Sequence, residues 1–166
     1  MRVIGVDPGT AVTGYGIVEL RGNVLRAVAY DCITTRSDQP MPLRLQYLYR
    51  QLEMVLKLHQ PGQFAVEELF FNKNVRTALA VGQARGIALL AAVNAGLEIA
   101  EYTPLEVKQA VVGYGRATKE QVQYMVRALL CLPEIPRPDD VADALAVAIC
   151  HAHRVSGRGH VRLTGI

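Results

Sequence analysis

The chain has 166 residues, of which about half are apolar, and a net charge of +3. This length and composition predict one folded domain with a substantial core and exclude extensive disorder. No apolar run reaches the roughly 20 residues that span a bilayer, and the N-terminus lacks the layout of a signal peptide. The three cysteines are far apart and form no CxxC pair, which favours a reducing cytoplasm over a disulfide framework or a zinc site.

The first predicted element is a strand that ends in a carboxylate. An apolar run that begins at Val3 ends in Asp7, turns through Pro-Gly and returns as a second apolar run that ends at Val18. This pattern predicts a buried strand, a tight turn and a paired antiparallel strand. The small residues around the turn would let a phosphate or a metal ion approach the backbone beside Asp7. An Asp before Pro-Gly is also an ordinary turn residue, so a functional Asp7 needs partners from elsewhere in the chain.

The next part of the chain alternates strands and helices. A third strand is expected at residues 24–34, followed by an amphipathic helix over 43–60. The apolar run 64–66 predicts a buried strand that ends in Glu67, and the C-terminal ends of strands are where open α/β sheets bind ligands. Glu67 is expected to point inward and Glu68 outward, because adjacent residues of a strand face opposite sides.

The rest of the chain continues this alternation. A helix is expected at 75–94 and a strand at 98–102. Two helices that begin with capping boxes follow, one after Thr103 and one after Thr118, and a last helix begins at Asp139 or Asp140. The helix at 75–94 is rich in Ala and has Gly82 and Gly86 four residues apart, so its backbone can pack closely against its own sheet or a second subunit. The order of elements predicts one α/β domain built on a mixed sheet.

Two acids at the start of the last helix complete a set of four. Asp140 and Asp143 are three residues apart and share one face of the first helical turn. The rest of this helix is apolar and packs in the core, so its acidic start can approach the strand ends that carry Asp7 and Glu67. Four like charges brought together need a cation, and oxygen ligands without His or Cys favour Mg²⁺ or Mn²⁺. The chemistry that fits is two-metal phosphoryl transfer, although each acid alone could be a helix cap or a solvated strand end.

Five short motifs follow one another along residues 1–155. They are, in chain order, Val6-Asp7-Pro8-Gly9-Thr10 with Thr13-Gly14-Tyr15-Gly16, then Ala65-Val66-Glu67, Gly82-Gln83-Ala84-Arg85-Gly86, Val107-Lys108-Gln109 leading to Gly113-Tyr114-Gly115, and Ala142-Asp143-Ala144-Leu145-Ala146. Together they resemble the RuvC family of crossover junction endodeoxyribonucleases, also called Holliday junction resolvases. The resemblance implies a ribonuclease-H-like α/β fold, a five-stranded mixed sheet with helices on both faces. We expect this single nuclease domain to cover residues 1–155 and a flexible basic tail to follow at 156–166.

The resemblance also implies the residues of the active site. The four catalytic, metal-binding acids of the family fall on Asp7, Glu67, Asp140 and Asp143, the same four that strand ends and helix spacing indicate. Asp140 is preferred to the adjacent Asp139 because its spacing to Asp143 fits the D-x-x-D pattern of the family. The implied cofactor is Mg²⁺, two ions per active site, with Mn²⁺ as a substitute.

Basic and aromatic residues of the family imply contacts with DNA. Lys108 and Lys119 match its basic residues, and Lys119 is counted with the catalytic groups. A lysine in the first turn of a helix is disfavoured by the helix dipole, so a phosphate partner would explain Lys119, whereas a solvent-facing lysine is the ordinary alternative. Phe70 matches an aromatic that stacks on a base, a contact worth about 1–3 kcal/mol, and its alternative role is to anchor the loop on the core. The further candidates for phosphate contacts are Lys73, Arg76 and Arg85.

The implied activity is a metal-dependent, structure-selective endonuclease that resolves four-way DNA junctions in recombination and repair. It would make paired symmetric nicks that leave 5′-phosphate and 3′-hydroxyl ends. Two nicks require two active sites, so we expect a homodimer with twofold symmetry, and the helix that carries Gly82 and Gly86 is the candidate interface. The family also implies cooperation with the RuvA–RuvB branch-migration machinery. The arginines of residues 151–166, which contain no acid, favour a polyanionic partner.

Three other functions are consistent with parts of this pattern. A ribonuclease-H-like nuclease that acts on RNA or on RNA–DNA hybrids would carry the same acids. Sugar kinases and actin-like ATPases have a similar first phosphate loop, but this chain is shorter and has neither a second such loop nor a Walker motif. A catalytically silent junction-binding module would lack one of the four acids, and all four are present.

Overall fold

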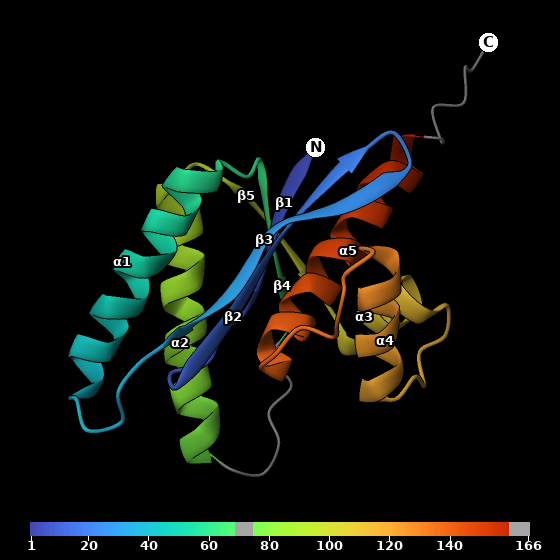
Figure 1. The fold of residues 1–166 in the computed structure, drawn as a ribbon. Coiled ribbons are helices and arrows are strands. Elements are labelled where there is room, and N and C mark those ends of the chain that lie inside the picture. Colours follow the sequence, from blue (N-terminus) through green and yellow to red (C-terminus); the bar gives the residue numbers. More distant parts are fainter. Residues whose placement is uncertain (69–74, 160–166) are drawn as a thin grey trace.

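The protein is built on one sheet of five strands in the computed structural model, which describes residues 1–68 and 75–159 (Figure 1). The strands are β1 (Arg2–Asp7), β2 (Val12–Arg21), β3 (Val24–Thr34), β4 (Gln63–Glu67) and β5 (Glu98–Tyr102). Their order across the sheet is β3-β2-β1-β4-β5. The pairs β1–β2 and β2–β3 are antiparallel, whereas β1–β4 and β4–β5 are parallel. The predicted mixed five-stranded sheet is confirmed.

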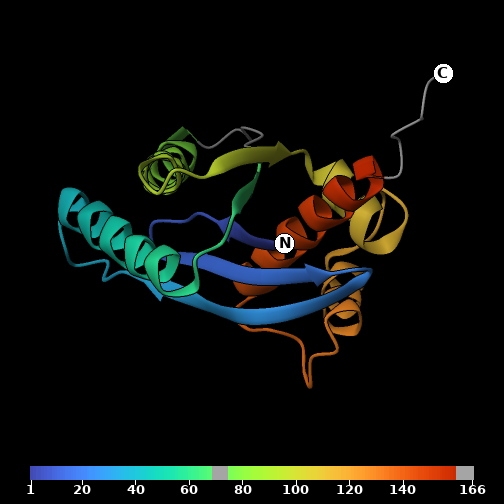
Figure 2. The same cartoon turned by 90° about the horizontal axis from the view of Figure 1, so that it is seen from above.

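Helices cover both faces of this sheet. They are α1 (Met41–His59), α2 (Val75–Asn94), α3 (Pro104–Val112), α4 (Lys119–Leu129) and α5 (Asp139–Gly159). Figures 1 and 2 show α1 and α2 on one face and α3, α4 and α5 on the other. Each face has its own apolar core. On the face covered by α1 and α2 the core includes Phe64 and Leu52, and on the other face it includes Leu145 and Ile149 of α5. The predicted capping boxes at Thr103 and Thr118 both form.

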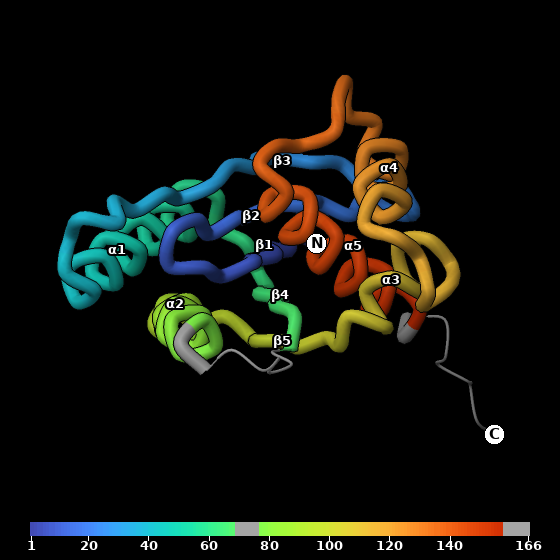
Figure 3. Tube along the Cα trace, turned by 90° about the horizontal axis from the view of Figure 1, so that it is seen from below, coloured from blue at the N-terminus to red at the C-terminus, as the bar shows by residue number. Residues whose placement is uncertain are grey.

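Helix α5 lies directly against the first hairpin. Seen from below in Figure 3, α5 runs between strands β1 and β2 on one side and α3 and α4 on the other. Glycines on the two strands make this close approach possible, because a Cβ at Gly5 would overlap the Ala144 carbonyl and a Cβ at Gly14 would overlap the Asp140 carbonyl. The hairpin therefore fixes where the acidic start of α5 lies.

Two helix boundaries differ from those predicted. Helix α1 begins at Met41 rather than at residue 43, and its Pro42 stands in the first turn, where the missing N–H has no helical partner to lose. Helix α5 begins at Asp139, so both Asp139 and Asp140 lie in its first turn rather than before it. It runs to Gly159, so residues 156–159 are helical although a flexible tail was expected from residue 156; residues 160–166 lie outside the described part of the chain.

No apolar run of roughly 20 residues was expected, and one 18-residue segment of α2, which includes Arg85, comes near that length. This segment, Thr77–Asn94, meets the criterion for a membrane span by length and composition, with a mean hydropathy of 1.2. The core helix of a globular protein can meet the same criterion, and Ala84, Ala88 and Ala92 of α2 are buried against the sheet. Only 28% of the segment is buried, and Leu79, Leu90 and Val93 are among its exposed residues.

Candidate active site

Two of the predicted acids stand together at one edge of the sheet. Asp7 is the last residue of β1 and Glu67 the last residue of β4. These strands are parallel, and Val6 is paired with Val66, so the next residue of each strand leaves the sheet at the same edge. Both side chains are half-buried, whereas Glu68 is exposed. The expected inward Glu67 and outward Glu68 agree with this geometry.

The other two acids come from the start of α5, which the hairpin holds at the same edge. Gly14 is paired with Asp7 across β1 and β2, and it lies against the backbone of Asp140. The turn between the strands is closed by Thr13, whose hydroxyl donates to the Gly9 carbonyl at 2.7 Å and accepts from the Gly9 N–H at 3.2 Å. The glycines of β2 thus admit α5, and the approach of a phosphate or a metal ion to the turn beside Asp7 stays a prediction.

A cleft of about 280 Å³ opens beside these acids. It is lined by Val6, Asp7, Glu67, Pro104, Val107, Lys108, Lys119, Val122, Asp143, Ala146 and Val147. Three of the four predicted acids and two of the three predicted lysines therefore face one cavity, and the remaining lining is apolar. Asp140 is not part of the lining; it lies half-buried next to Gly14. A cavity that combines apolar walls with converging charges is typical of an active site.

The acids of the cleft carry more negative charge than their surroundings neutralise. Burial raises the pKa of Asp7 to about 7, and the charges of Asp143, Asp140 and Glu67 contribute to this rise. Burial also raises the pKa of Glu67, and Asp143 adds to the effect while Lys108 opposes it. Such a cluster of mutually repelling carboxylates is stabilised by a bound cation.

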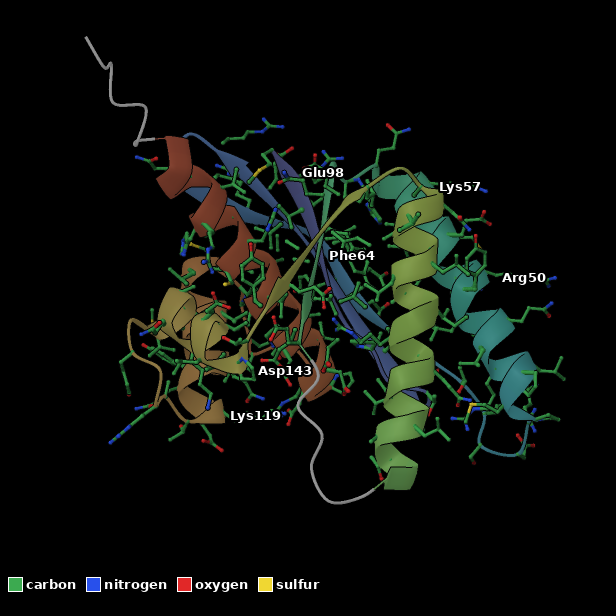
Figure 4. The ribbon with its side chains drawn as sticks, turned by 180° about the vertical axis from the view of Figure 1, so that it is seen from behind. Arg50, Lys57, Phe64, Glu98, Lys119 and Asp143 are labelled. Carbon is green, nitrogen blue, oxygen red and sulfur yellow. The ribbon has the colours of Figure 1, made fainter. Side chains whose placement is uncertain are left out.

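Lys119 supplies part of the missing positive charge. Its Nζ lies 3.1 Å from Asp143 Oδ2 and 3.4 Å from Asp139 Oδ2, so the lysine joins the first turn of α4 to the start of α5. Figure 4 shows Lys119 and Asp143 together at one end of the molecule, opposite Glu98 at the start of β5. Burial tends to lower the pKa of Lys119, but its bonds to Asp143 and Asp139 outweigh this and raise the pKa. In the structure Lys119 therefore pairs with carboxylates, whereas the sequence suggested a phosphate.

The donor set fits Mg²⁺ or Mn²⁺ by its chemistry, because these cations prefer carboxylate oxygens. Their arrangement is not that of a ready-made metal site, since among residues 1–68 and 75–159 no group of three or more Asp, Glu, His or Cys side chains is placed to hold one ion. Burial is the main cause of the raised pKa of Asp7, and repulsion from Asp143, Asp140 and Glu67, which a cation would relieve, adds to it. Simultaneous coordination would require their carboxylates to rotate toward one another.

The predicted DNA contacts have different outcomes. Lys108 and Lys119 face the cleft. Phe70 and Lys73 lie outside the described residues, and for Arg76 the structure describes the helical backbone but not the side chain. Arg85 is buried, with 9% of its surface exposed, and both terminal nitrogens are bonded within the protein. The prediction that Arg85 contacts phosphate does not fit this location, because reaching DNA would break its bonds to the Glu67 carbonyl and to the Glu101 carboxylate.

The sequence reasoning missed two contributors to the site. Asp139 was regarded only as a rival of Asp140, yet it holds the outer side of Lys119 and also pairs with Arg137. The sequence predicts Arg85 as a phosphate contact, and its bonds inside the domain were not predicted. The sequence signal for Asp139 is its place beside Arg137 just before the helix, and the signal for Arg85 is its setting among the alanines of its helix.

Comparison with known proteins gives a consistent picture. The family model described as "Crossover junction endodeoxyribonuclease RuvC" matches residues 3–151. Curated proteins of that name from Desulforamulus reducens and Pelotomaculum thermopropionicum are 63% and 61% identical over 92% and 98% of this chain, and 93% and 99% of their own lengths.

Solved structures resemble the chain over a similar extent. "T. thermophilus RuvC in complex with Holliday junction substrate" has a TM-score of 0.90 at 39% identity and covers 95% of this chain and 96% of its own. A yeast mitochondrial Holliday junction resolvase, at 14% identity and a TM-score of 0.71, covers 96% of this chain and 81% of its own and shows the same fold.

Proposed function

The chain belongs to the RuvC family of crossover junction endodeoxyribonucleases, and on that premise we propose that it is a nuclease that resolves four-way DNA junctions. The observation that carries the proposal is the cleft in which Asp7, Glu67 and Asp143 face Lys108 and Lys119. Carboxylates that converge at the C-terminal edge of a sheet, with lysines opposite, fit the cutting of a phosphodiester in a polyanionic substrate.

The residues that would hold divalent cations are Asp7, Glu67, Asp140 and Asp143. Bound there, two Mg²⁺ ions, or Mn²⁺ in their place, would neutralise the clustered charge and make a water molecule more acidic. The raised pKa of Asp7 supports this role, because a carboxylate that is buried and also lies near other acids is stabilised in its charged form by a cation.

The lysines of the cleft are proposed to orient the scissile phosphate. Lys119 is 49% exposed at its side chain and is held by Asp143 and Asp139, so its ammonium can meet a phosphate without leaving the cleft. Lys108 lines the same cavity. Water would attack the phosphorus in line and the 3′-oxygen would leave, which gives 5′-phosphate and 3′-hydroxyl ends. Further DNA contacts are proposed for Phe70, Lys73 and Arg76.

A homodimer is proposed because two strands of a junction must be cut. The exposed face of α2 supports it as the interface: Leu79, Leu90 and Val93 are 64%, 49% and 60% exposed. Gly82 and Gly86 lie on open surface, where an added Cβ would meet nothing within 4 Å. Close packing inside the domain therefore does not account for these glycines. Exposed apolar side chains with Gly82, Gln83 and Gly86 between them fit a second copy of the helix related by a twofold axis.

The wider context is also a proposal. Residues 1–155 are proposed as the nuclease domain, with a basic segment at 156–166 that is helical up to Gly159 and could approach DNA. Three free cysteines support a reducing cytoplasm as its location. Recombination and repair, in cooperation with the RuvA–RuvB branch-migration machinery, follow from the family.

The test compares a synthetic four-way DNA junction with a linear duplex and an RNA–DNA hybrid of the same sequences. Each is incubated with the wild-type protein or Asp7→Asn, in Mg²⁺ or EDTA. We expect paired nicks on the junction alone, only in Mg²⁺ and only with the wild type, while Asp7→Asn still binds the junction. Binding without nicking in Mg²⁺ or Mn²⁺ would leave only a binding module. Preferred cutting of the hybrid would point to a ribonuclease.

A further inference from the structure

Helix α2 carries a buried positive charge between two glycines that border open space. Arg85 stands between Gly82 and Gly86 in the sequence, but its side chain is only 11% exposed, whereas the glycines lie on open surface. Burying a guanidinium raises the free energy of the folded state unless its donors are paired. The contacts of Arg85 therefore indicate its structural role.

Those contacts join the ends of two strands. Arg85 Nη1 donates to the backbone carbonyl of Glu67 at 2.5 Å, and Arg85 Nη2 forms an ion pair with the carboxylate of Glu101. Glu67 is the last residue of β4, and Glu101 is paired with Val66 on the neighbouring strand β5. The planar guanidinium can make both contacts at once, which the single ammonium of a lysine cannot do in the same geometry.

The peptide group after Glu67 is thereby held on both sides. Its carbonyl accepts from Arg85, and its N–H, that of Glu68, donates to the Tyr102 carbonyl at 2.7 Å. Fixing the plane of this peptide fixes the backbone torsion of Glu67 and so the direction in which its side chain leaves β4. Because β4 ends at Glu67, the bond from Arg85 holds this carbonyl at the point where the strand stops.

We propose that Arg85 is a positioning residue. It orients the Glu67 carboxylate into the cleft and couples this orientation to the position of helix α2. The inference rests on the proposed function, in which Glu67 is a metal ligand and α2 the dimer interface. Because Arg85 and the two glycines belong to the same helical segment, the position of α2 in the dimer and the position of Glu67 in the cleft are mechanically linked.

The protein contains a matched control for this arginine. Arg2 Nη1 also donates to a backbone carbonyl, that of His59, at 2.6 Å, and Arg2 Nη2 donates to the carboxylate of Glu19 at 3.2 Å. It lies at the start of β1, the opposite end of the strand from Asp7. Arg2→Lys and Arg85→Lys therefore remove the same kind of guanidinium contact with a carbonyl and a carboxylate. Arg2 lies far from the cleft and Arg85 lies beside it.

The experiment uses the full chain with both variants and the wild type. For Arg85→Lys we expect junction cleavage at saturating protein to slow by about 10- to 100-fold, because small misplacements of reacting groups have effects of that size. Its junction affinity in EDTA should stay within about twofold of wild type. The rise in melting temperature that Mg²⁺ gives the DNA-free protein should shrink or vanish. Arg2→Lys should keep the wild-type rate, affinity and Mg²⁺ response, even if its melting temperature falls.

Each outcome has one meaning. If Arg85→Lys cuts at the wild-type rate and keeps the full Mg²⁺ response, or if Arg2→Lys is impaired equally, the positioning role is wrong. If the wild type itself does not cut junctions, the proposed function fails instead. If Arg85→Lys does not fold, Glu101→Gln takes its place, since it loosens the guanidinium without emptying its site. A several-fold slower cut with unchanged affinity supports the proposal, and a wild-type rate overturns it.

Discussion

Lys119 and Asp143 form an ion pair across the cleft, with 3.1 Å between Nζ and Oδ2. The lysine belongs to the first turn of α4 and the acid to the start of α5, so this pair closes one side of the site. Asp139, at 3.4 Å, holds the same ammonium from the outer side. The cleft thus contains the positive charge of Lys119. This charge lies between Asp143, which is proposed to bind metal, and Asp139, which does not face the cavity.

Replacing this lysine by a neutral side chain is expected to slow the reaction strongly. In Lys119→Met the scissile phosphate loses a positive partner, and we expect single-turnover cleavage to fall by about 10²-fold or more, as for the loss of other charge-stabilising groups. The pKa of Asp143 should rise, because Lys119 now works to lower it. Lys57→Met, which removes an exposed lysine paired with Glu53 on α1, serves as the control. Equal rates for the two variants would show that Lys119 has no special role.

The raised pKa of Asp7 predicts how stability depends on pH without metal. Its carboxyl has a pKa of about 7 in the folded protein against 3.8 in a model peptide. The folded state therefore takes up a proton, and the wild type loses stability as pH rises through this interval. The loss is complete above about pH 7 and amounts to about 4 kcal/mol.

Asp7→Asn removes this penalty, so in EDTA the variant should be more stable than the wild type at about pH 8 and equal to it near pH 4. Denaturant unfolding at several pH values measures the difference. Adding Mg²⁺ should restore stability to the wild type but not to Asp7→Asn. A variant that is less stable than the wild type at both pH values would contradict the pKa assigned to Asp7.

The close contact between the hairpin and α5 predicts that Gly14 tolerates no side chain. In Gly14→Ala the new methyl group would overlap the Asp140 backbone, which forces α5 away from Asp7. We expect a loss of about 3 kcal/mol in the free energy of unfolding, together with loss of cleavage in the fraction that folds. Gly62→Ala is the control, because its Cβ would meet only the Arg2 carbonyl at 3.8 Å. If Gly14→Ala behaved like Gly62→Ala, α5 would not be fixed by this contact.

The exposed face of α2 predicts the effect of a charge on assembly. Leu79→Glu places a carboxylate on the proposed interface and should weaken the dimer by at least about tenfold in dissociation constant. The monomer should still fold, since Leu79 is 64% exposed. The matched change Leu58→Glu, at a leucine of α1 that is 77% exposed, should leave the dimer intact. Sedimentation velocity distinguishes the two, and a dimer that survives Leu79→Glu but not Leu58→Glu would move the interface to α1.

Much of the fold could be predicted because its signals are local. The bounds of β3, α2 and β5 match those predicted, and turns with glycines in the left-handed conformation, Gly22 and Gly96, precede two of them. The ends of β1 and β4 could be predicted in the same way, since each apolar run stops at an acid. The parallel pairing of these two strands then brings Asp7 and Glu67 to one edge of the sheet.

What could not be predicted depends on contacts between distant segments. Nothing local shows that Gly14 faces the Asp140 backbone, so the small residues near Asp7 looked like space for a ligand. Arg85 looked like a surface arginine, because its partners Glu67 and Glu101 lie on strands that only the sheet order brings beside α2. The two carboxylate partners of Lys119, Asp143 and Asp139, were not predicted, for the same reason.

The central claim is that four particular carboxylates make this chain a junction nuclease. The most direct test measures nicking and binding of a four-way junction in Mg²⁺ by Asp7→Asn, Glu67→Gln, Asp140→Asn and Asp143→Asn, with Glu68→Gln as the control. Glu68 is the exposed neighbour of Glu67 and differs from it in the direction of its side chain. We predict that the four variants bind the junction but nick it at least about 10³-fold more slowly, whereas Glu68→Gln nicks it at the wild-type rate. Nicking that survives in any of the four, or that is lost equally in Glu68→Gln, would contradict the assignment.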